Sequence, residues 1–421
     1  MKRFSNCAKW IGIWVFVALA TVSTPLFAAG IRVVGCEEPV QSYKRGVCEN
    51  HLSAEDFRAL APGVSWFYNW HFESKDLPPE GVKMEFLPMC WGDTQERLDG
   101  LDRYLSNHKP RAVLAINEPN LKGQAFIPPE QTAKLYLKIK AIADKHGIPV
   151  AGPNMALGSS ENDSIKAMDP IDNKQTTYTF MVPFLKAFMH YVGDDKKVGA
   201  MAWHGYGHSG EFNWAMNLLT KEFNKPAWVT EYAWWKAPND AEEMRFMMQA
   251  TDAMERSENV PGYAWFKERV GGNRKISLFE KESGKLTPLG KAYVNMPVHD
   301  ADLFYRIPGK LSAGRYLTMK NMQIFPSSDG GAFADMVADK GGASIDYNLQ
   351  SDAAGQYTVR LRVNGAESVT AGNGSLTLGK KAGKDWKTIE TKLQLNKGTG
   401  TLRVNIPDKD QRIESIEFVK P

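Results

Sequence analysis

The chain has 421 residues, of which 43% are hydrophobic and 24% are charged. This mixture excludes a wholly disordered chain, a collagen-like chain and a small disulfide scaffold. Residues 1–28 hold three positive charges and no acid, so the formal net charge of +4 falls to +1 without them. A charge so close to neutral argues against a protein that binds nucleic acid through its phosphates.

The N-terminus has the pattern of a targeting segment. Three basic residues precede an apolar run over residues 10–20, and small residues lead from this run to Ala28. This order predicts a secretory signal peptide over residues 1–28 and hence a secreted or periplasmic protein. The run is short for a membrane span, and no later segment reaches about 18 apolar residues, so we predict no span.

Three cysteines remain after removal of this segment. An oxidising compartment permits a disulfide between Cys36 and Cys48, which we predict. Cys90 lies in an apolar run and is expected to be a buried thiol. A less favoured alternative reads residues 33–36 as a lipoprotein processing site, with an anchor at Cys36. Arg32 and the distance from the apolar run argue against it.

A strand-and-helix rhythm extends from about residue 45 to residue 290. Its eight apolar runs cover residues 45–48, 64–70, 84–91, 112–117, 149–153, 198–206, 227–232 and 262–266. Amphipathic segments lie between them, as at 53–60 and 130–145. Continuous apolar strands that alternate with helices indicate a parallel sheet covered on both faces. We therefore predict an α/β fold, a (β/α)8 TIM barrel over residues 30–300.

The pattern changes after residue 300. Tyr357, Val359, Leu361 and Val363 alternate with polar neighbours, and glycine, asparagine, aspartate and lysine separate the later short runs. Short alternating strands joined by turns predict a smaller, all-β, jelly-roll-like sandwich over residues 305–421.

Two glutamates follow predicted barrel strands. Glu118 comes directly after the fourth run, and Glu231 lies at the carboxyl end of the seventh, one residue before its last. A barrel carries its chemistry at the carboxyl ends of its strands, where a carboxylate beside apolar residues is costly unless it is used or paired. Two such carboxyl groups suit cleavage of a glycosidic bond, in which one protonates the departing oxygen and the other attacks the anomeric carbon or activates water. Either glutamate alone would equally fit a helix cap or an arginine partner; the pair favours catalysis.

Aromatic residues surround these positions. Side chains alternate between the two faces of a strand, so some rings must belong to the core. We expect core positions for Trp66, Phe67 and Trp228. Trp70, Trp91 and Trp265 lie later in their strands, nearer the mouth, where a flat ring would stack on a sugar.

Residues 45–280 resemble the catalytic domain of glycoside hydrolase family 128, a group of clan A. The resemblance rests on Lys-Arg-Gly at 44–46, Trp-Phe-Tyr-Asn-Trp at 66–70, Leu-Pro-Met at 87–89 with Trp-Gly at 91–92, Asn-Glu-Pro at 117–119, His-Gly-Tyr-Gly at 204–207, Trp-Val-Thr-Glu-Tyr at 228–232 and Tyr-Ala-Trp-Phe at 263–266. It implies endo-acting hydrolysis of β-1,3-glucan with retention of configuration. It assigns Glu118 as acid/base and Glu231 as nucleophile, in agreement with the strand count.

The same resemblance suggests a set of substrate-binding residues. Asn117 would bond the 2-hydroxyl of the cleaved sugar, Tyr206 or His204 would orient Glu231, and Trp265 would floor the central subsite. The full predicted set is Asn69, Trp70, Trp91, Asn117, His204, Tyr206 and Trp265.

Two features depart from the family pattern. Many relatives carry aspartate where this chain has Asn120, a change that touches the loop and not the two carboxylates. Residues 158–178 form a long polar segment that either reshapes the cleft or is a solvated insertion. The β-1,3 linkage is therefore less firmly implied than hydrolysis.

Residues 310–420 more faintly resemble a family 6 carbohydrate-binding module. The opening motif of that family supplies two glutamates to a structural calcium, but this chain has Ser312 and Gly314 there. Glycan binding and a purely structural role both stay open. The candidate binding aromatics are Tyr305, Phe325, Phe333 and Trp386.

We expect no metal, because the glycines around His204 and His208 indicate a loop and no carboxylate stands at ligand spacing. No cofactor is predicted either. The leading hypothesis is a secreted, monomeric, retaining endo-β-1,3-glucanase whose partner is its β-glucan substrate, acting on glucans of the laminarin or curdlan type. The alternatives are a hydrolase of another β-linked polysaccharide and a non-catalytic glycan-binding protein on the same barrel.

Overall fold

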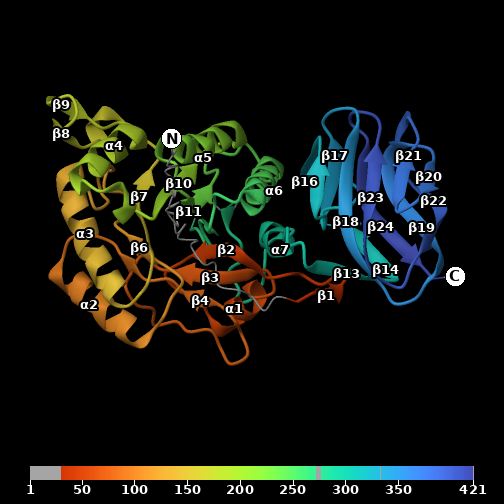
Figure 1. The fold of residues 1–421 in the computed structure, drawn as a ribbon, viewed down its shortest axis with the longest axis horizontal. Helices are drawn as coiled ribbons and strands as arrows, with labels where there is room; N and C mark the ends of the chain where they lie inside the picture. The colour runs from red at the N-terminus through yellow and green to blue at the C-terminus, as the bar shows by residue number, and fades with distance from the viewer. Residues whose placement is uncertain (1–29, 272–275, 332, 421) are drawn as a thin grey trace, which may run out of the picture.

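The computed structural model describes residues 30–271, 276–331 and 333–420, so the expected signal peptide lies outside the described residues. An α/β part and a strand-rich C-terminal part lie side by side (Figure 1). None of the helices in the described ranges has the length and apolar character needed to cross a bilayer.

A single parallel sheet forms the centre of the α/β part. Its strands are β2 (Ser42–Cys48), β3 (Val64–Tyr68), β4 (Glu85–Phe86), β5 (Met89–Cys90), β6 (Val113–Ala115), β7 (Val150–Ala156), β10 (Ala200–Tyr206), β11 (Ala227–Ala233) and β12 (Tyr263–Trp265). All eight predicted runs contain a strand, and the third run holds both β4 and β5. The order β4-β3-β2-β12-β11-β10-β7-β6-β5 places these two short strands at opposite ends of the sheet.

The two ends of this sheet meet in one segment of chain. Only Leu87 and Pro88 separate β4 from β5. The Leu87 amide donates to Phe67 of β3, whereas the Pro88 carbonyl accepts from Leu114 of β6. Proline has no N–H with which to continue the first ladder, and the chain changes partners here. The sheet therefore curls on itself, as in a TIM-like fold.

Helices flank the sheet. They are α1 (Ala54–Leu60), α2 (Gln95–Asn107), α3 (Pro129–Lys145), α4 (Met181–Val192), α5 (Ser209–Phe223), α6 (Asp240–Arg256) and α7 (Pro288–Asn295), with 3-10 turns at Glu161–Asp163 and Asp195–Lys197. A capping box begins α1, because Ser53 and Asp56 each accept a hydrogen bond from the other's backbone N–H. The polar segment 158–178 contains a hairpin of β8 (Lys166–Asp169) and β9 (Lys174–Thr177).

Two further sheets form the C-terminal part. One has the order β1-β13-β18-β23-β21-β20, with β15 on β18. Its strands are β1 (Arg32–Gly35), β13 (Leu303–Ile307), β15 (Thr318–Lys320), β18 (Ala343–Ser351), β20 (Val369–Gly372), β21 (Ser375–Leu378) and β23 (Gly398–Ile406). The other has the order β16-β17-β24-β19-β22, with β14 on β24. Its strands are β14 (Gly309–Ser312), β16 (Met322–Pro326), β17 (Ala334–Ala338), β19 (Gly355–Ala366), β22 (Lys381–Leu395) and β24 (Arg412–Val419).

The side chains of β19 show why these sheets pack together. Tyr357, Val359, Leu361 and Val363 are buried, and the residues between them are at least partly exposed. One face of the strand thus lies in the core, and the other faces outward.

The first strand departs from the predicted domain division. The predicted barrel range of 30–300 includes residues 32–35, but β1 pairs in parallel with β13 and so belongs to a sheet of the C-terminal part. Arg315 reinforces this arrangement by donating to the carbonyl oxygens of Glu37 and Glu38. The chain therefore contacts the C-terminal part before it enters the α/β part, so the two parts are joined at both ends of the α/β sequence.

The predicted disulfide between Cys36 and Cys48 is wrong. Cys36, Cys48 and Cys90 are all buried free thiols in the described part of the chain. Cys36 follows β1 and donates to the Arg306 carbonyl at 3.0 Å, whereas Cys48 ends β2 and donates to the Trp265 carbonyl at 3.2 Å. The expectation for Cys90 is confirmed, and burial raises the pKa of its thiol to about 12.

Reducing agent is accordingly expected to leave the melting temperature unchanged. Loss of a native disulfide would cost about 2–5 kcal/mol, which a thermal melt detects easily. The measurement is a pair of melts with and without dithiothreitol, alongside thiol titration of the unfolded chain. A lower melting temperature in the presence of the reductant would contradict the conclusion that these cysteines are free thiols.

Candidate active site

Glu231 lies within β11, in which every residue is buried. Its Oε1 accepts from Trp70 Nε1 at 2.7 Å and from the Tyr68 hydroxyl at 3.1 Å. Its Oε2 accepts from the Tyr206 hydroxyl. Three donors that converge on both oxygens suit an ionised carboxylate, which can only accept hydrogen bonds. The side chain is therefore held in one orientation.

The tyrosines beside Glu231 are kept as donors. Burial, and after it the charge of Glu231, raises the pKa of Tyr206 and of Tyr68 well above the usual 10. Both hydroxyls consequently keep their protons throughout the neutral pH range.

Glu118 lies in an unusual stretch of backbone after β6. Ile116 and Glu118 both adopt left-handed conformations, with φ of 57° and 42°. For a β-branched residue such as Ile116 this is a true outlier, with a cost of about 1–3 kcal/mol. The Glu118 amide donates to the Asn154 carbonyl at 2.7 Å, which fixes the turn against β7.

Two buried asparagines hold this turn in place. Asn154 donates to the Ala115 carbonyl at 2.8 Å and accepts from the Thr230 hydroxyl at 2.8 Å. Asn120 donates to the Ala156 carbonyl at 2.9 Å and accepts from the Ala156 amide at 3.1 Å. An ionised aspartate has no donor for the first of these two bonds. The structure thus gives Asn120 a positioning role.

His204 connects the two carboxylates. Its Nδ1 lies 2.8 Å from Glu118 Oε1 and 3.4 Å from Glu231 Oε2. These two oxygens therefore lie no further apart than the sum of the two distances, about 6.2 Å. Burial lowers the pKa of His204, but the charges of Glu231 and Glu118 outweigh it and the net shift is upward. Among the described residues, Nε2 has no hydrogen-bond partner.

A pocket of about 340 Å³ opens beside these groups. Its lining includes Glu118, His204 and Tyr206, together with Phe180 and Trp214. Trp214 is 52% exposed, and its ring stacks on that of Phe180 with centroids 5.6 Å apart. A larger cavity of about 630 Å³ lies next to α2, but it contains neither glutamate and is not the candidate site.

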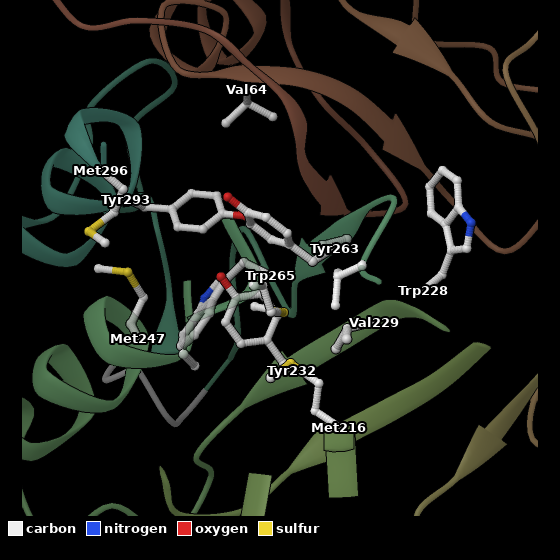
Figure 2. Close-up of a cluster of buried hydrophobic side chains, with 14 of the residues drawn as sticks. Val64, Met216, Trp228, Val229, Tyr232, Met247, Tyr263, Trp265, Tyr293 and Met296 are labelled. Atoms are coloured by element: carbon white, nitrogen blue, oxygen red, sulfur yellow. The ribbon is translucent and has the colours of Figure 1, made fainter. Parts of the chain in front are cut away.

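The prediction that Trp265 faces substrate is wrong. The side chain is fully buried and donates to the Ile276 carbonyl at 2.7 Å. Figure 2 shows it within a cluster that includes Tyr232 and Tyr293. The Trp265 side chain points to the face of β12 that packs against the helices, so the side chain of the next residue points to the opposite face. Phe266 accordingly packs edge-on against Trp70 and Tyr206, with centroids 5.8 and 5.5 Å away.

The other predicted residues divide into two groups. Trp70, Asn117, His204 and Tyr206 lie at or next to the two glutamates. Asn117 donates to Gln124 at 3.0 Å, and its buried Oδ1 has no partner in the described ranges. Asn69 closes a turn, with bonds to the backbone of Glu73 and His71. Trp91 lies under the Arg97 guanidinium, 5.2 Å from the ring centroid, and does not line the pocket.

Sequence reasoning missed several residues here. Tyr68 binds Glu231 directly, although its strand predicts only packing. Trp214 lies on α5, and Trp235 follows β11; Trp235 is 39% exposed and packs against Phe266. The available signal for Trp214 was a tryptophan on the polar face of an amphipathic helix. The expected core residues Trp66, Phe67 and Trp228 are confirmed as buried.

A charged cluster lies beside the site. Lys267 Nζ donates to Glu49 at 3.1 Å and lies 6.0 Å from the Trp70 ring centroid. Glu268 is 1% exposed and contacts Arg269. Burial, with a further contribution from the charge of Glu49, raises the pKa of Glu268 from 4.5 to about 9.

Stability is therefore expected to fall as the pH rises. Folding raises the pKa of Glu268, so its contribution to the free energy of unfolding is fully present below the pKa of the unfolded chain, about 4.5. This contribution decreases as the pH rises and is lost at about pH 9. The side chain of the Glu268→Gln variant stays neutral at every pH. Between pH 4.5 and 9 the melting temperature of this variant should therefore fall less than that of the parent protein, by about 2–4 °C for each kcal/mol of difference in the free energy of unfolding. If the melting temperatures of the variant and the parent protein changed equally with pH, Glu268 would not be a buried neutral acid.

No group of three or more histidine, cysteine, aspartate or glutamate side chains in the described ranges is arranged to hold a metal ion. The described side chains at the site are two neighbouring carboxyl groups, a histidine, and several hydroxyl and indole donors. Paired carboxyl groups at the strand ends of a curled parallel sheet define a site of the glycosidase type.

The family model of the glycosyl hydrolase catalytic core matches residues 46–293, more than half of the chain. The chain therefore belongs to this family. A family 128, subgroup II endo-β-1,3-glucanase from Pseudomonas viridiflava is 29% identical, with a TM-score of 0.52 over 62% of this chain and 100% of the other. The corresponding enzyme from Sorangium cellulosum is 28% identical, with a TM-score of 0.52 over 61% and 100%. No curated protein matches the chain.

Proposed function

We propose that this protein is a secreted, retaining endo-β-1,3-glucanase that acts on glucans of the laminarin or curdlan type. The observation that carries the proposal is the pair of buried glutamates, Glu118 and Glu231, joined through one nitrogen of His204. The choice of β-1,3-glucan is supported by the two subgroup II relatives, both of which are endo-β-1,3-glucanases.

In the proposed first step, Glu118 gives its proton to the glycosidic oxygen while Glu231 attacks the anomeric carbon. The carbon–oxygen bond to the leaving chain breaks, and a bond to the Glu231 carboxylate forms. In the second step, Glu118 takes a proton from water as the water oxygen displaces Glu231. Asn117, next to the acid, would bond the 2-hydroxyl of the sugar at the cleavage point.

The spacing of the carboxyl groups favours retention. Retaining glycosidases hold them about 5–5.5 Å apart, and inverting enzymes about 6.5–9.5 Å apart to admit a water. The two oxygens that face His204 lie within about 6.2 Å, below the inverting range. Time-resolved NMR of the first product should therefore show the β-anomer before mutarotation.

His204 is proposed to share the catalytic proton with Glu118. The distance of 2.8 Å between Nδ1 and Oε1 allows the proton to reside on either atom. Charge on His204 would also balance the ionised Glu231. Tyr68, Trp70 and Tyr206 keep Glu231 aimed at the anomeric carbon through their hydrogen bonds.

Substitution His204→Gln tests this role. The pKa of His204 is raised, so the pair retains its proton to higher pH than it would without the imidazole. We expect kcat/KM to fall at least about tenfold, or about 1.4 kcal/mol, and the alkaline limb of the pH profile to move to lower pH. His190→Gln, an exposed position on α4, is the control. An unmoved alkaline limb would contradict the shared proton.

Secretion is also proposed, on the basis of the N-terminal sequence pattern. Residues 32–35 form β1 in a sheet with β13, which supports cleavage before β1 in preference to lipid attachment at Cys36. The aromatic residues considered for glycan binding by the C-terminal part differ in their surroundings. Phe325 and Trp386 are on β16 and β22, the opposite ends of one sheet's strand order. Tyr305 is buried, and the half-buried Phe333 packs against the Arg315 guanidinium. An aromatic binding face is therefore not part of the proposal.

Product analysis on laminarin, curdlan, cellulose and mannan tests the substrate. We expect oligosaccharides of several lengths from laminarin and curdlan, and none from cellulose or mannan. Glu231→Gln should abolish the products. Cleavage of mannan or cellulose alone would contradict the assigned linkage, and release of glucose alone would contradict endo action.

A further inference from the structure

A second hollow lies between the barrel and the C-terminal part. Its volume is about 330 Å³, and both parts of the chain form its walls. Asn213 of α5 and Gln249 of α6 line one side, and Met319, Met322 and Gln323 line the other. We call this hollow the interdomain groove. It exists only because the two parts pack against each other.

Hydrogen bonds across the interface fix the shape of the groove. The buried carboxylate of Asp252, on α6, accepts from the Tyr316 hydroxyl of the C-terminal part and from Arg256 Nε at 3.0 Å. His299 Nε2 lies 3.4 Å from the same carboxylate. Gln249 also donates to the Ile324 carbonyl at 3.4 Å. Breaking such a buried network is costly, so the groove is a permanent feature of the fold.

The groove and the active-site pocket lie on neighbouring faces of α5. Glu211 and Trp214 line the pocket, whereas Gly210 and Asn213 line the groove. Figure 1 shows α5, α6 and β16 next to one another. A helix with its side chains is about 10–12 Å across. An extended polysaccharide would therefore reach the groove only with a few sugar units beyond those held in the active-site pocket. The exposed Trp214 ring lies on this route.

The chemistry of the groove suits a neutral, hydroxyl-rich chain. The amides of Asn213 and Gln323 are exposed and, within the described ranges, bond to no other protein group. Amides both donate to and accept from hydroxyls. Methionine side chains adapt to the apolar faces of a ligand. The lining cation, Arg256, is paired with Asp252, so an anionic ligand is not favoured.

We propose that the interdomain groove binds the distal part of the same β-glucan chain that occupies the active-site pocket. The inference rests on the proposed function. The C-terminal part would then make the enzyme favour long chains by extending the cleft, without acting as a separate binding module. The family 128 relatives match over about three fifths of this chain, so the likeness does not extend to the whole of it.

The test uses the full-length double variant Asn213→Ala/Gln323→Ala and compares two substrates. For laminarin we expect kcat/KM to fall about fivefold, chiefly through KM, because two hydrogen bonds to the substrate are lost. For laminaripentaose, which is too short to reach the groove, we expect no change. The matched control Asn217→Ala/Gln356→Ala removes the same two side-chain types outside the groove. An equal effect on both substrates, or none on either, would overturn the proposal.

A binding measurement separates this proposal from the proposed function. Electrophoresis through gels that contain laminarin would be run with the double variant and its control, each combined with Glu231→Gln. We expect the groove variant to be retarded less than the control. Equal retardation of the two proteins, or no retardation of either, would overturn the proposal that the groove binds glucan. Failure of the wild-type enzyme to cleave laminarin and laminaripentaose would instead contradict the proposed function.

Discussion

Glu231→Gln is expected to lower kcat on laminarin by roughly 10⁴-fold, because an amide cannot attack the anomeric carbon. The amide also removes hydrogen bonds. Trp70 and Tyr68 donate to one oxygen of Glu231, and Tyr206 donates to the other. Whichever oxygen the NH₂ group replaces, it cannot accept the hydrogen bond of the donor that faces it. The measurement is kcat on laminarin, with a thermal melt to show that the variant folds.

A matched control is available close to the site. Glu211 lines the pocket beside Glu118, but it is exposed on α5 and is not among the groups that donate hydrogen bonds to Glu231. Glu211→Gln should retain activity within a few-fold of the wild type. If both variants kept most of their activity, or lost it equally, the assignment of Glu231 as nucleophile would be wrong.

Glu118→Ala is expected to have the second-largest effect, and the effect should depend on the leaving group. On laminarin, kcat/KM should fall about 10²–10⁴-fold, the usual contribution of a general acid. A dinitrophenyl glycoside of a β-1,3-glucan oligosaccharide has a leaving group that needs no proton, so its first step should change little.

Azide provides the diagnostic arm of this experiment. Without Glu118 to activate water, the glycosyl-enzyme accumulates, and azide reacts with it without a general base. We expect azide to accelerate turnover of the dinitrophenyl substrate by the variant and to yield a β-glycosyl azide. Absence of rescue, or an α-glycosyl azide, would contradict the role of Glu118 as acid/base in a retaining mechanism.

Local patterns in the sequence predict the sheet well. Buried parallel strands appear as continuous apolar runs, and each of the eight predicted runs contains a strand. The two glutamates were also predictable, since residues at the ends of such strands share one edge of the sheet. Long-range pairing was not. The sequence around Arg32 carries no signal that β1 joins β13, about 270 residues later.

Side-chain direction was the harder problem at the site. Adjacent residues of a strand point to opposite faces, so an error of one residue exchanges Trp265 with Phe266. The bridging role of His204 depends on three different strand ends, which only the assembled sheet brings together. The cysteines show the same limitation. Cys36 and Cys48 are near neighbours in sequence, but the chain carries them into different parts of the fold.

The most direct test of the account is covalent trapping of the intermediate. A 2-deoxy-2-fluoro oligosaccharide with an activated leaving group and β-1,3 linkages would be incubated with the enzyme, followed by peptide mass spectrometry. We expect one equivalent of sugar, attached as an ester to the peptide that contains Glu231. A label on a different carboxylate, or turnover without any label and with an inverted first product, would contradict it.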